Sequence, residues 1–356
     1  MAAFREGTIV SILERSDRLL RAHIALGDES IEAVGFPAML GPLETGDRVV
    51  VNTTALELGL GTGGNGFLLW NLDGPGSVDR GPGHIIKMRY TPWQTEVLAA
   101  EAPESPHHSS LEEVTSIAGM PVVACGLHSQ IAGVAAGIRQ RLPQAVIGYV
   151  MTDAGALPLA WSKLVRTLQQ EGLINFTCTV GNAFGGDLEA VNVFSGLAVA
   201  RAVGGADVAI VAMGPGIAGT DTALGFSGIE QGQVLDAITS LQGRPVACLR
   251  ISFADERTRH QGLSHHTITA LTLACHSRTT VPVPELPHKL SEVLLSQLHR
   301  HGISDRHAIV PAEGEPGLGL LKKSGVQVRT MGRPMEDTPE AILAAAAAGW
   351  VAASRL

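Results

Sequence analysis

Side chains that bind anions, move protons or ligate metals are concentrated between residues 250 and 266. The segment follows the apolar run Pro245–Leu249, which predicts a buried strand. A loop that only meets solvent rarely needs so many such groups, so this segment is the first candidate for a functional site. It contains Arg250, Asp255, Glu256, Arg257, Arg259, His260, His265 and His266.

Two interpretations of this segment make it a site for a small anion. Arginine forks pair with phosphate or carboxylate, and a helix beginning near His265 would add N–H donors, together with Ser264. One histidine held by Asp255 would move protons near neutral pH. This interpretation assigns acid–base roles to Asp255, His260, His265 and His266, and ligand binding to Arg250, Arg257, Arg259 and Ser264.

Two further interpretations remain open. Asp255 and the three histidines supply enough donors for a metal, but the spacing His-x-x-x-x-His-His matches no standard ligand pattern. No metal ligand is therefore predicted. Alternatively, Asp255 and Glu256 pair with Arg257 and Arg259 in an ion-pair network that only fixes a long loop.

Four other predicted strands also end in polar or glycine-rich segments. The carboxyl ends of parallel strands lie on one edge of a sheet, where open α/β folds bind ligands. We therefore expect these segments to join the first one in a pocket. They begin with Gly126-Leu127-His128, Met151-Thr152-Asp153, Gly181-Asn182 and Met213-Gly214-Pro215-Gly216.

Within these segments, the glycines 214, 216 and 219 with Thr220 are predicted to hold a phosphate or carboxylate. They depart from the dinucleotide fingerprint because no matching acid follows about 20 residues later. A nicotinamide cofactor is therefore not expected, and the sequence identifies no other cofactor. His128 and Asp153 are candidate catalytic residues by their position after strands, although both types also begin helices and hold turns. Asp187 fits the N-cap of a helix.

The elements that position these segments fall into two regions. Residues 1–100 contain about six short β runs, typical of a small barrel or sandwich. Residues 101–115 are polar and contain prolines, as linkers do. From 116 to 356, apolar strands alternate with amphipathic helices, which predicts a mostly parallel, doubly wound, Rossmann-like α/β sheet. The glycine-rich stretch 59–66 is predicted to be a hairpin, because a phosphate loop needs a lysine and a strand–turn–helix setting.

The predicted strands of the first region are 7–13, 19–26, 30–36, 49–51, 66–72 and 84–90. Those of the second are 121–125, 145–151, 176–180, 207–212, 245–251, 280–283, 307–311 and 326–330. The predicted helices are 129–141, 159–171, 187–203, 232–241, 288–301 and 339–353.

Composition excludes several classes of partner. The formal charge of −8 argues against nucleic acid, which needs a basic surface. No apolar run reaches the roughly 20 residues of a membrane span, and the N-terminus has no signal-peptide core. Four widely spaced cysteines are typical of reduced, buried thiols. We expect a cytoplasmic protein that binds a small anionic molecule and can form homo-oligomers.

The chain resembles an uncharacterised bacterial family, a domain of unknown function, over its whole length. The segments that carry the resemblance are Gly83–Pro92, Cys125–Gln130, Asp187–Asn192, Ser252–Asp255 and Ser264–His266. The resemblance implies one recurring architecture and transfers no activity. The residues favour an enzyme that binds a small anionic metabolite at the sheet edge and uses His/Asp acid–base chemistry. The alternatives are a metal-dependent hydrolase using Asp153, Asp255 and the histidines, and a non-catalytic ligand-binding or assembly protein.

Overall fold

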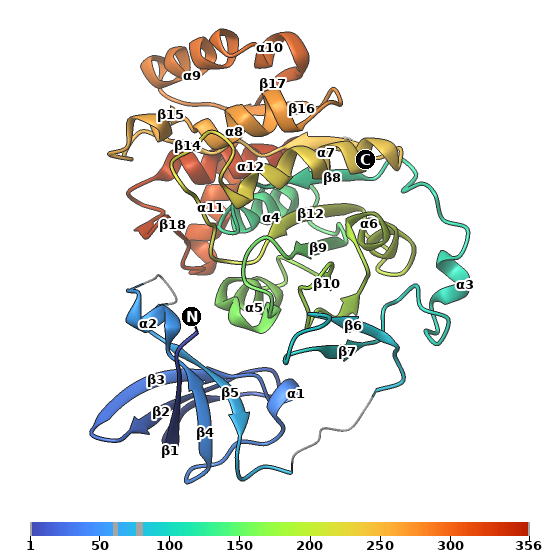
Figure 1. The fold of residues 1–356 in the computed structure, drawn as a ribbon. Coiled ribbons are helices and arrows are strands. Elements are labelled where there is room, and N and C mark those ends of the chain that lie inside the picture. The colour runs from blue at the N-terminus through green and yellow to red at the C-terminus, as the bar shows by residue number, and fades with distance from the viewer. Residues whose placement is uncertain (1, 60–62, 76–80, 355–356) are drawn as a thin grey trace. The chain divides into compact units, whose positions relative to one another are not determined.

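The computed structural model describes residues 2–59, 63–75 and 81–354. The chain divides into two compact units: residues 1–82 with 86–96, and residues 83–85 with 97–356. Figure 1 shows the elements of each unit.

The first unit is a closed five-stranded barrel with the strand order β1-β2-β3-β5-β4. Apolar side chains alternate along β2, so one side of the strand is buried and the other is partly exposed, as a barrel wall requires. The predicted small β domain is therefore a barrel. Its elements are β1 (Phe4–Arg15), β2 (Leu20–Leu26), β3 (Glu29–Gly35), β4 (Arg48–Asn52) and β5 (Gly66–Asn71), with the short helices α1 (Pro37–Leu40) and α2 (Thr54–Glu57).

The sixth predicted strand, residues 84–90, is not part of the barrel. Only β6 (Ile85–Lys87) is extended, and it pairs with β7 (Thr95–Val97) in a separate two-stranded sheet. Met88 and Tyr90 have φ angles of 52° and 60°, a left-handed conformation that ends the strand. The predicted hairpin at 59–66 falls partly on residues 60–62, which lie outside the described residues.

The second unit is built on an eight-stranded sheet in which all pairings are parallel. Its order is β11-β10-β9-β12-β8-β13-β16-β17. The chain runs from β8 through β9 and β10 to β11 at one edge, returns to place β12 between β9 and β8, and then continues through β13 and β16 to β17 at the other edge. This is the predicted doubly wound α/β fold. The strands are β8 (Pro121–Ala124), β9 (Ile147–Thr152), β10 (Phe176–Thr179), β11 (Leu188–Glu189), β12 (Val208–Met213), β13 (Arg244–Ala247), β16 (Thr280–Pro284) and β17 (Ala308–Ala312).

Helices cover both faces of this sheet (Figure 1). Because strand side chains alternate, Val122 and Ala124 belong to one apolar core while Val123 and Cys125 belong to the other. The first core includes residues of α6 (Val193–Ala202), α7 (Glu230–Ser240) and α9 (His288–Arg300). The second includes residues of α4 (Gln130–Arg141), α5 (Lys163–Gln170), α11 (Glu315–Ser324) and α12 (Pro339–Ala353).

Two predicted elements of the second unit are wrong. The helix predicted to start at Asp187 begins at Val193, where Asn192 and Ser195 form a capping box. Asp187 instead accepts hydrogen bonds from the backbone N–H and hydroxyl of Thr177, and β11 follows it. The strand predicted at 326–330 is only β18 (Arg329–Thr330), which pairs with β19 (Arg333–Pro334) outside the main sheet.

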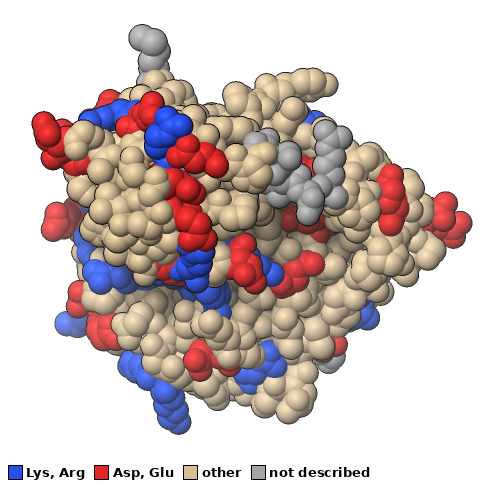
Figure 2. Space-filling model, turned by 90° about the horizontal axis from the view of Figure 1, so that it is seen from below, with Lys and Arg blue, Asp and Glu red and all other residues tan. Residues whose placement is uncertain are grey.

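The cysteines, the helices and the surface charges can be compared with the predictions from composition. All four cysteines are buried and unbridged, as predicted. Among the described residues, no helix combines the length and apolar character needed to cross a membrane. On the face drawn in Figure 2, basic and acidic side chains are interspersed, and the described residues there form no continuous basic surface.

Candidate functional site

The segment singled out in the sequence leaves the sheet after β13 and folds into a hairpin. Its strands are β14 (Ile251–Ser252) and β15 (Gly262–Leu263), which pair antiparallel. A 3₁₀ turn, Thr258–His260, lies in the loop between them. The helix α8 (His265–Thr269) follows at once and continues as a π-helix, Ala270–Ala274, a distortion that is frequent at functional sites.

Hydrogen bonds from backbone and side-chain groups hold the base of this hairpin. The Ser264 N–H donates to the Arg250 carbonyl over 3.0 Å, and the Arg250 N–H donates to the Thr267 hydroxyl over 3.0 Å. From α9, Gln297 accepts the Leu263 N–H at 2.7 Å and donates to the Gln261 carbonyl at 3.1 Å. The positions of Arg250 and of the histidines on α8 are therefore fixed by the surrounding backbone.

The hairpin and the loop after β12 enclose a pocket of about 190 Å³. Because β12 and β13 flank β8, the two loops leave the sheet on either side of its central strand. Both follow the carboxyl ends of parallel strands, where open α/β sheets bind ligands. The lining comprises Ile217, Ala218, Gly219, Thr220, Asp221, Thr222, Gly225, Arg250, Arg257, Arg259, His260, His265, His266 and Met331.

Arg250 is a buried cation in this pocket, with only 7% of its surface exposed. Its guanidinium donates to Nδ1 of His266 at 2.7 Å. Within the described part of the chain, no carboxylate lies within ion-pair distance of it. Burial, followed by the charge of Arg257, lowers the pKa of Arg250 to about 10. A buried charge without a counter-ion is costly, so this guanidinium is suited to receive an anion.

The other two arginines each contact a carboxylate. Arg257 donates two hydrogen bonds of 2.9 Å to the Asp255 carboxylate, and Arg259 forms an ion pair with Asp221. The Nε atom of Arg259 is nevertheless buried with no hydrogen-bond partner among the described residues. The pocket thus combines three guanidinium groups with one lining carboxylate, that of Asp221.

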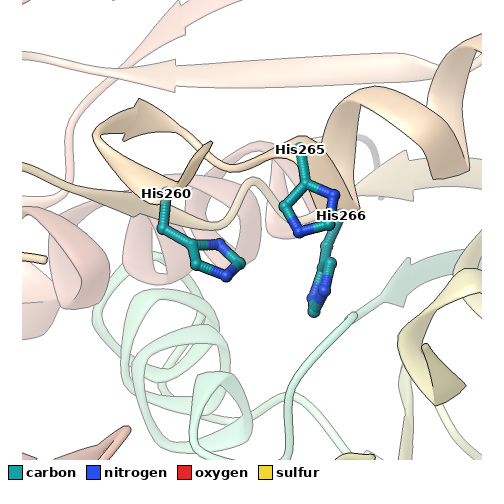
Figure 3. A group of neighbouring side chains, drawn as sticks. All are labelled: His260, His265 and His266. Atoms are coloured by element: carbon teal, nitrogen blue, oxygen red, sulfur yellow. The ribbon is translucent and has the colours of Figure 1, made fainter. Parts of the chain in front are cut away.

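The three histidines gather against one another, as Figure 3 shows. The ring of His265 lies 4.8 Å from that of His260 and 4.3 Å from that of His266, between centroids. Nδ1 of His260 is 2.7 Å from the Ser264 hydroxyl. Nε2 of His265 is buried and, among the described residues, has no hydrogen-bond partner.

All three imidazoles favour the neutral form. Burial and then the Arg250 charge lower the pKa of His260 to about 4 and that of His266 to about 2. Burial and then the Arg259 charge lower the pKa of His265. The pocket therefore carries its positive charge on arginine and keeps its histidines uncharged near neutral pH.

The histidine nitrogens lie within 4.8 Å of one another, which raises the question of a metal. Two observations weigh against a bound cation. Arg250 can only donate, so Nδ1 of His266 is the acceptor and the ring proton sits on Nε2, whereas a metal needs a free lone pair. The three guanidinium groups would also repel a cation. The donor set fits an anion better.

The comparison with known families covers most of the chain. A family model described as "Protein of unknown function (DUF3866)" matches residues 32–349. The chain belongs to this family. A search of curated proteins found no match. The match spans both α/β cores and the pocket, and it assigns no activity to the DUF3866 chain.

Some of the predicted site residues come together in this DUF3866 pocket. The lining includes Arg250, Arg257, Arg259, His260, His265, His266, Gly219 and Thr220. Ser264 is fully buried behind them, where its hydroxyl accepts the His266 N–H and contacts His260. Asp255 is also buried outside the lining, held by Arg257 at its carboxylate and with Arg333 3.7 Å away.

The structure does not bring the remaining candidates into the pocket lining. Nδ1 of His128 is 3.0 Å from the Met213 carbonyl, and its Nε2 is 2.7 Å from the Ser162 hydroxyl. Burial lowers the pKa of His128 to about 4. Asp153 accepts the Asn182 backbone N–H at 2.8 Å. Gly214 serves a close approach of two loops, because a Cβ there would lie 2.3 Å from the Ala156 carbonyl, and Gly216 is exposed outside the lining.

Several residues that contribute to the DUF3866 site were not predicted as site residues, including Ile217, Ala218, Thr222 and Gly225 of the lining. Phe226 stacks on the His266 ring, with centroids 3.9 Å apart, and Asp221 and Met331 line the pocket. Asp221 directly follows the predicted Gly219-Thr220 pair in the same segment, and this position was the signal that could have identified it. Phe226 and Met331 carry no sequence signal, since an apolar residue in a loop is ordinary.

Proposed function

We propose that this protein is an enzyme that binds a small anionic metabolite, with a phosphate or carboxylate group, in the pocket of Arg250, Arg259 and His265. The observation that carries the proposal is a set of buried polar groups that lack a counter-ion or a hydrogen-bond partner. Arg250 is buried without a carboxylate partner, and Nε of Arg259 and Nε2 of His265 are buried without any partner in the described residues. Buried polar groups are normally satisfied, so such a set calls for a ligand.

The size of the pocket limits the ligand. A volume of about 190 Å³ is below the ~300–1,000 Å³ typical of sites for drug-sized molecules. It suits a small anion or the charged end of a longer metabolite. The neutral histidines beside the arginines supply groups for acid–base chemistry on that anion.

Titration calorimetry with inorganic phosphate, glycerol 3-phosphate and malate tests the proposal. We expect at least one of them to bind the wild-type protein. Arg259→Ala should weaken that binding by roughly 10- to 100-fold, the equivalent of one charge-assisted hydrogen bond. Arg300→Ala, on the exposed side of α9, is the matched control and should leave binding unchanged. Equal affinities for both variants would contradict the proposal.

A metal-dependent hydrolase is the second candidate, because the three histidines cluster. In this version Asp153 and Asp255 take no part, since neither lines the pocket. Elemental analysis of the purified protein distinguishes the two. We expect no stoichiometric zinc or manganese and no thermal shift with zinc, manganese or magnesium. A non-catalytic binding protein would bind the same anions but turn over no phosphorylated or carboxylated metabolite.

A further inference from the structure

The three histidines of the pocket differ in what their ring nitrogens already contact. His266 accepts from Arg250 through Nδ1, and His260 contacts the Ser264 hydroxyl through Nδ1. Nε2 of His265 is buried at the pocket and has no partner among the described residues. Of the three rings, His265 therefore has the nitrogen best placed to form a new hydrogen bond with a ligand.

The groups around His265 come from two parts of the chain, the hairpin segment and the loop after β12. Charged groups that disfavour its protonation come from the hairpin, a carboxylate that favours it comes from the loop after β12, and Phe226 packs edge-on at 5.8 Å between centroids. Burial is the largest cause of its lowered pKa, followed by the charge of Arg259. The titratable and charged groups that face it are Arg250, Arg257, Arg259, Asp221, His260 and His266.

An anion bound among the arginines changes this balance. It places negative charge beside His265 and offsets the guanidinium charges that keep the ring neutral. Protonation then gives the ring an N–H at both nitrogens, so Nε2 becomes a donor that an anion in the pocket can accept from. His266 is less able to respond, because Arg250 already donates to its Nδ1 and protonation there would break that bond.

We infer that His265 is the acid–base residue of this pocket, and that an anion binds there together with one proton taken up by Nε2 of His265. The proton comes from solvent, and the N–H bond is the only covalent bond formed. This inference rests on the proposed function and adds to it the identity of the proton carrier. His260 and His266 are positioning residues that hold the pocket walls.

Sulfate is the probe of choice, because it does not titrate near neutral pH and any proton taken up must come to the protein. Calorimetry at pH 6.5 in two buffers with different ionisation enthalpies gives the number of protons bound. We expect an uptake approaching one in the wild-type protein. Between pH 6 and 8, sulfate affinity should fall by up to about tenfold per pH unit, the limit for one linked proton.

The variant His265→Gln keeps an amide donor of similar reach but cannot titrate. It should bind sulfate with no proton uptake and with an affinity that is flat over this pH range. His299→Gln, at an exposed histidine of α9 outside the pocket, is the matched control and should keep the wild-type slope. Nuclear magnetic resonance of the histidine Cε1 protons identifies the ring whose pKa rises with sulfate.

The possible outcomes distinguish anion binding by the pocket from proton uptake by His265. If sulfate binds but no proton is taken up, or if His265→Gln retains the uptake, this inference is overturned while anion binding stands. If neither sulfate nor phosphate binds the wild-type protein, the proposed function fails and this inference fails with it. A loss of all binding in His265→Gln, with circular dichroism unchanged and the pH slope present in the wild type, supports the inference.

Discussion

Arg250 is the residue at which function and stability oppose each other most directly. Replacing a buried, uncompensated charge by an apolar side chain of similar size is often neutral or stabilising by about 1–4 kcal/mol. The loss of its hydrogen bond to His266 costs about 1 kcal/mol in return. We therefore expect Arg250→Met to melt at or above the wild-type temperature and to lose the stabilisation by phosphate.

Thermal unfolding with and without phosphate measures both effects. Arg250→Lys keeps the charge but not the planar fork, so it should show a reduced response to phosphate. If the Arg250→Met protein without phosphate melts several degrees below the wild type, the guanidinium stabilises the fold. That result would argue against an anion site.

Asp255 makes the stability of the pocket loop depend on pH. The hydrogen bonds from the Arg257 side chain hold the pKa of this carboxyl well below its usual range. A depressed pKa contributes stability that is present above the unfolded pKa of about 3.9 and is lost as the pH falls toward the folded value.

We expect Asp255→Asn to be less stable than the wild type at pH 7 by about 1–3 kcal/mol, a figure that allows for the partly exposed position of Arg257. The difference should shrink as the pH falls below about 4, because the carboxyl is then protonated in the unfolded chain while Arg257 still keeps it ionised in the folded protein. Urea unfolding between pH 3 and 7 tests this, with the exposed Asp337→Asn as control. A difference that does not change with pH would show that the charge has no part in it.

At the scale of elements, local residue patterns predicted most of the helices, but they could not predict which strands lie side by side in the sheet. The helices α4, α7, α9 and α12 lie within two residues of their predicted bounds. Apolar periodicity predicted the first three, whereas α12 was predicted from its alanine content and the polar start signal before it, and most of its residues are buried. The helix at 187–203 was misplaced because Asp187 resembles an N-cap, while the true cap, Asn192, lies five residues later. Local pattern does not distinguish two such caps.

The hairpin that carries the site depends on one glycine. Gly262 has a φ of 70°, and a Cβ there would lie 2.3 Å from Oε1 of Gln297, the atom that accepts the Leu263 N–H. Gly262→Ala should therefore destabilise the protein by about 1–2 kcal/mol through backbone strain alone, and by more through the clash. The substitution should also weaken phosphate binding, because the hydrogen bond from the Ser264 N–H to the Arg250 carbonyl lies close to Gly262 in the hairpin.

The double variant Gly262→Ala/Gln297→Ala separates the two costs when it is compared with Gln297→Ala alone. Both variants lack the hydrogen bonds of Gln297, so the difference between them contains the strain without the clash. Chemical denaturation of the single and double variants gives the free energies of unfolding. If Gly262→Ala is as stable as the wild type, the hairpin geometry described for residues 251–263 is contradicted.

At the scale of the molecule, the sequence predicted that five named loops would meet in one pocket, but only two of the five supply residues to its lining. The loops after β12 and β13 share a pocket because their strands flank β8. Asp153 follows β9, which lies further from β13, and it does not reach the lining. Strand order arises from packing of the whole sheet, so spacing along the chain carries no trace of it. Arg250, His260 and His265 were found because one segment supplies them all.

The two compact units each have their own apolar core, so we expect them to unfold in separate transitions. The pocket lies wholly within the second unit, and a ligand stabilises only the state that binds it. Phosphate should therefore raise the melting temperature of the second unit and leave that of the barrel unchanged.

The four tryptophans allow each unit to be observed alone. Trp70 and Trp93 belong to the barrel unit, while Trp161 and Trp350 belong to the α/β unit. Fluorescence melting of Trp70→Phe/Trp93→Phe reports the α/β unit, and that of Trp161→Phe/Trp350→Phe reports the barrel. The expected result is a phosphate-dependent shift in the first variant only. If both variants melt at the same temperature and phosphate raises that temperature equally, the two units unfold together. Anion binding then stabilises the whole chain.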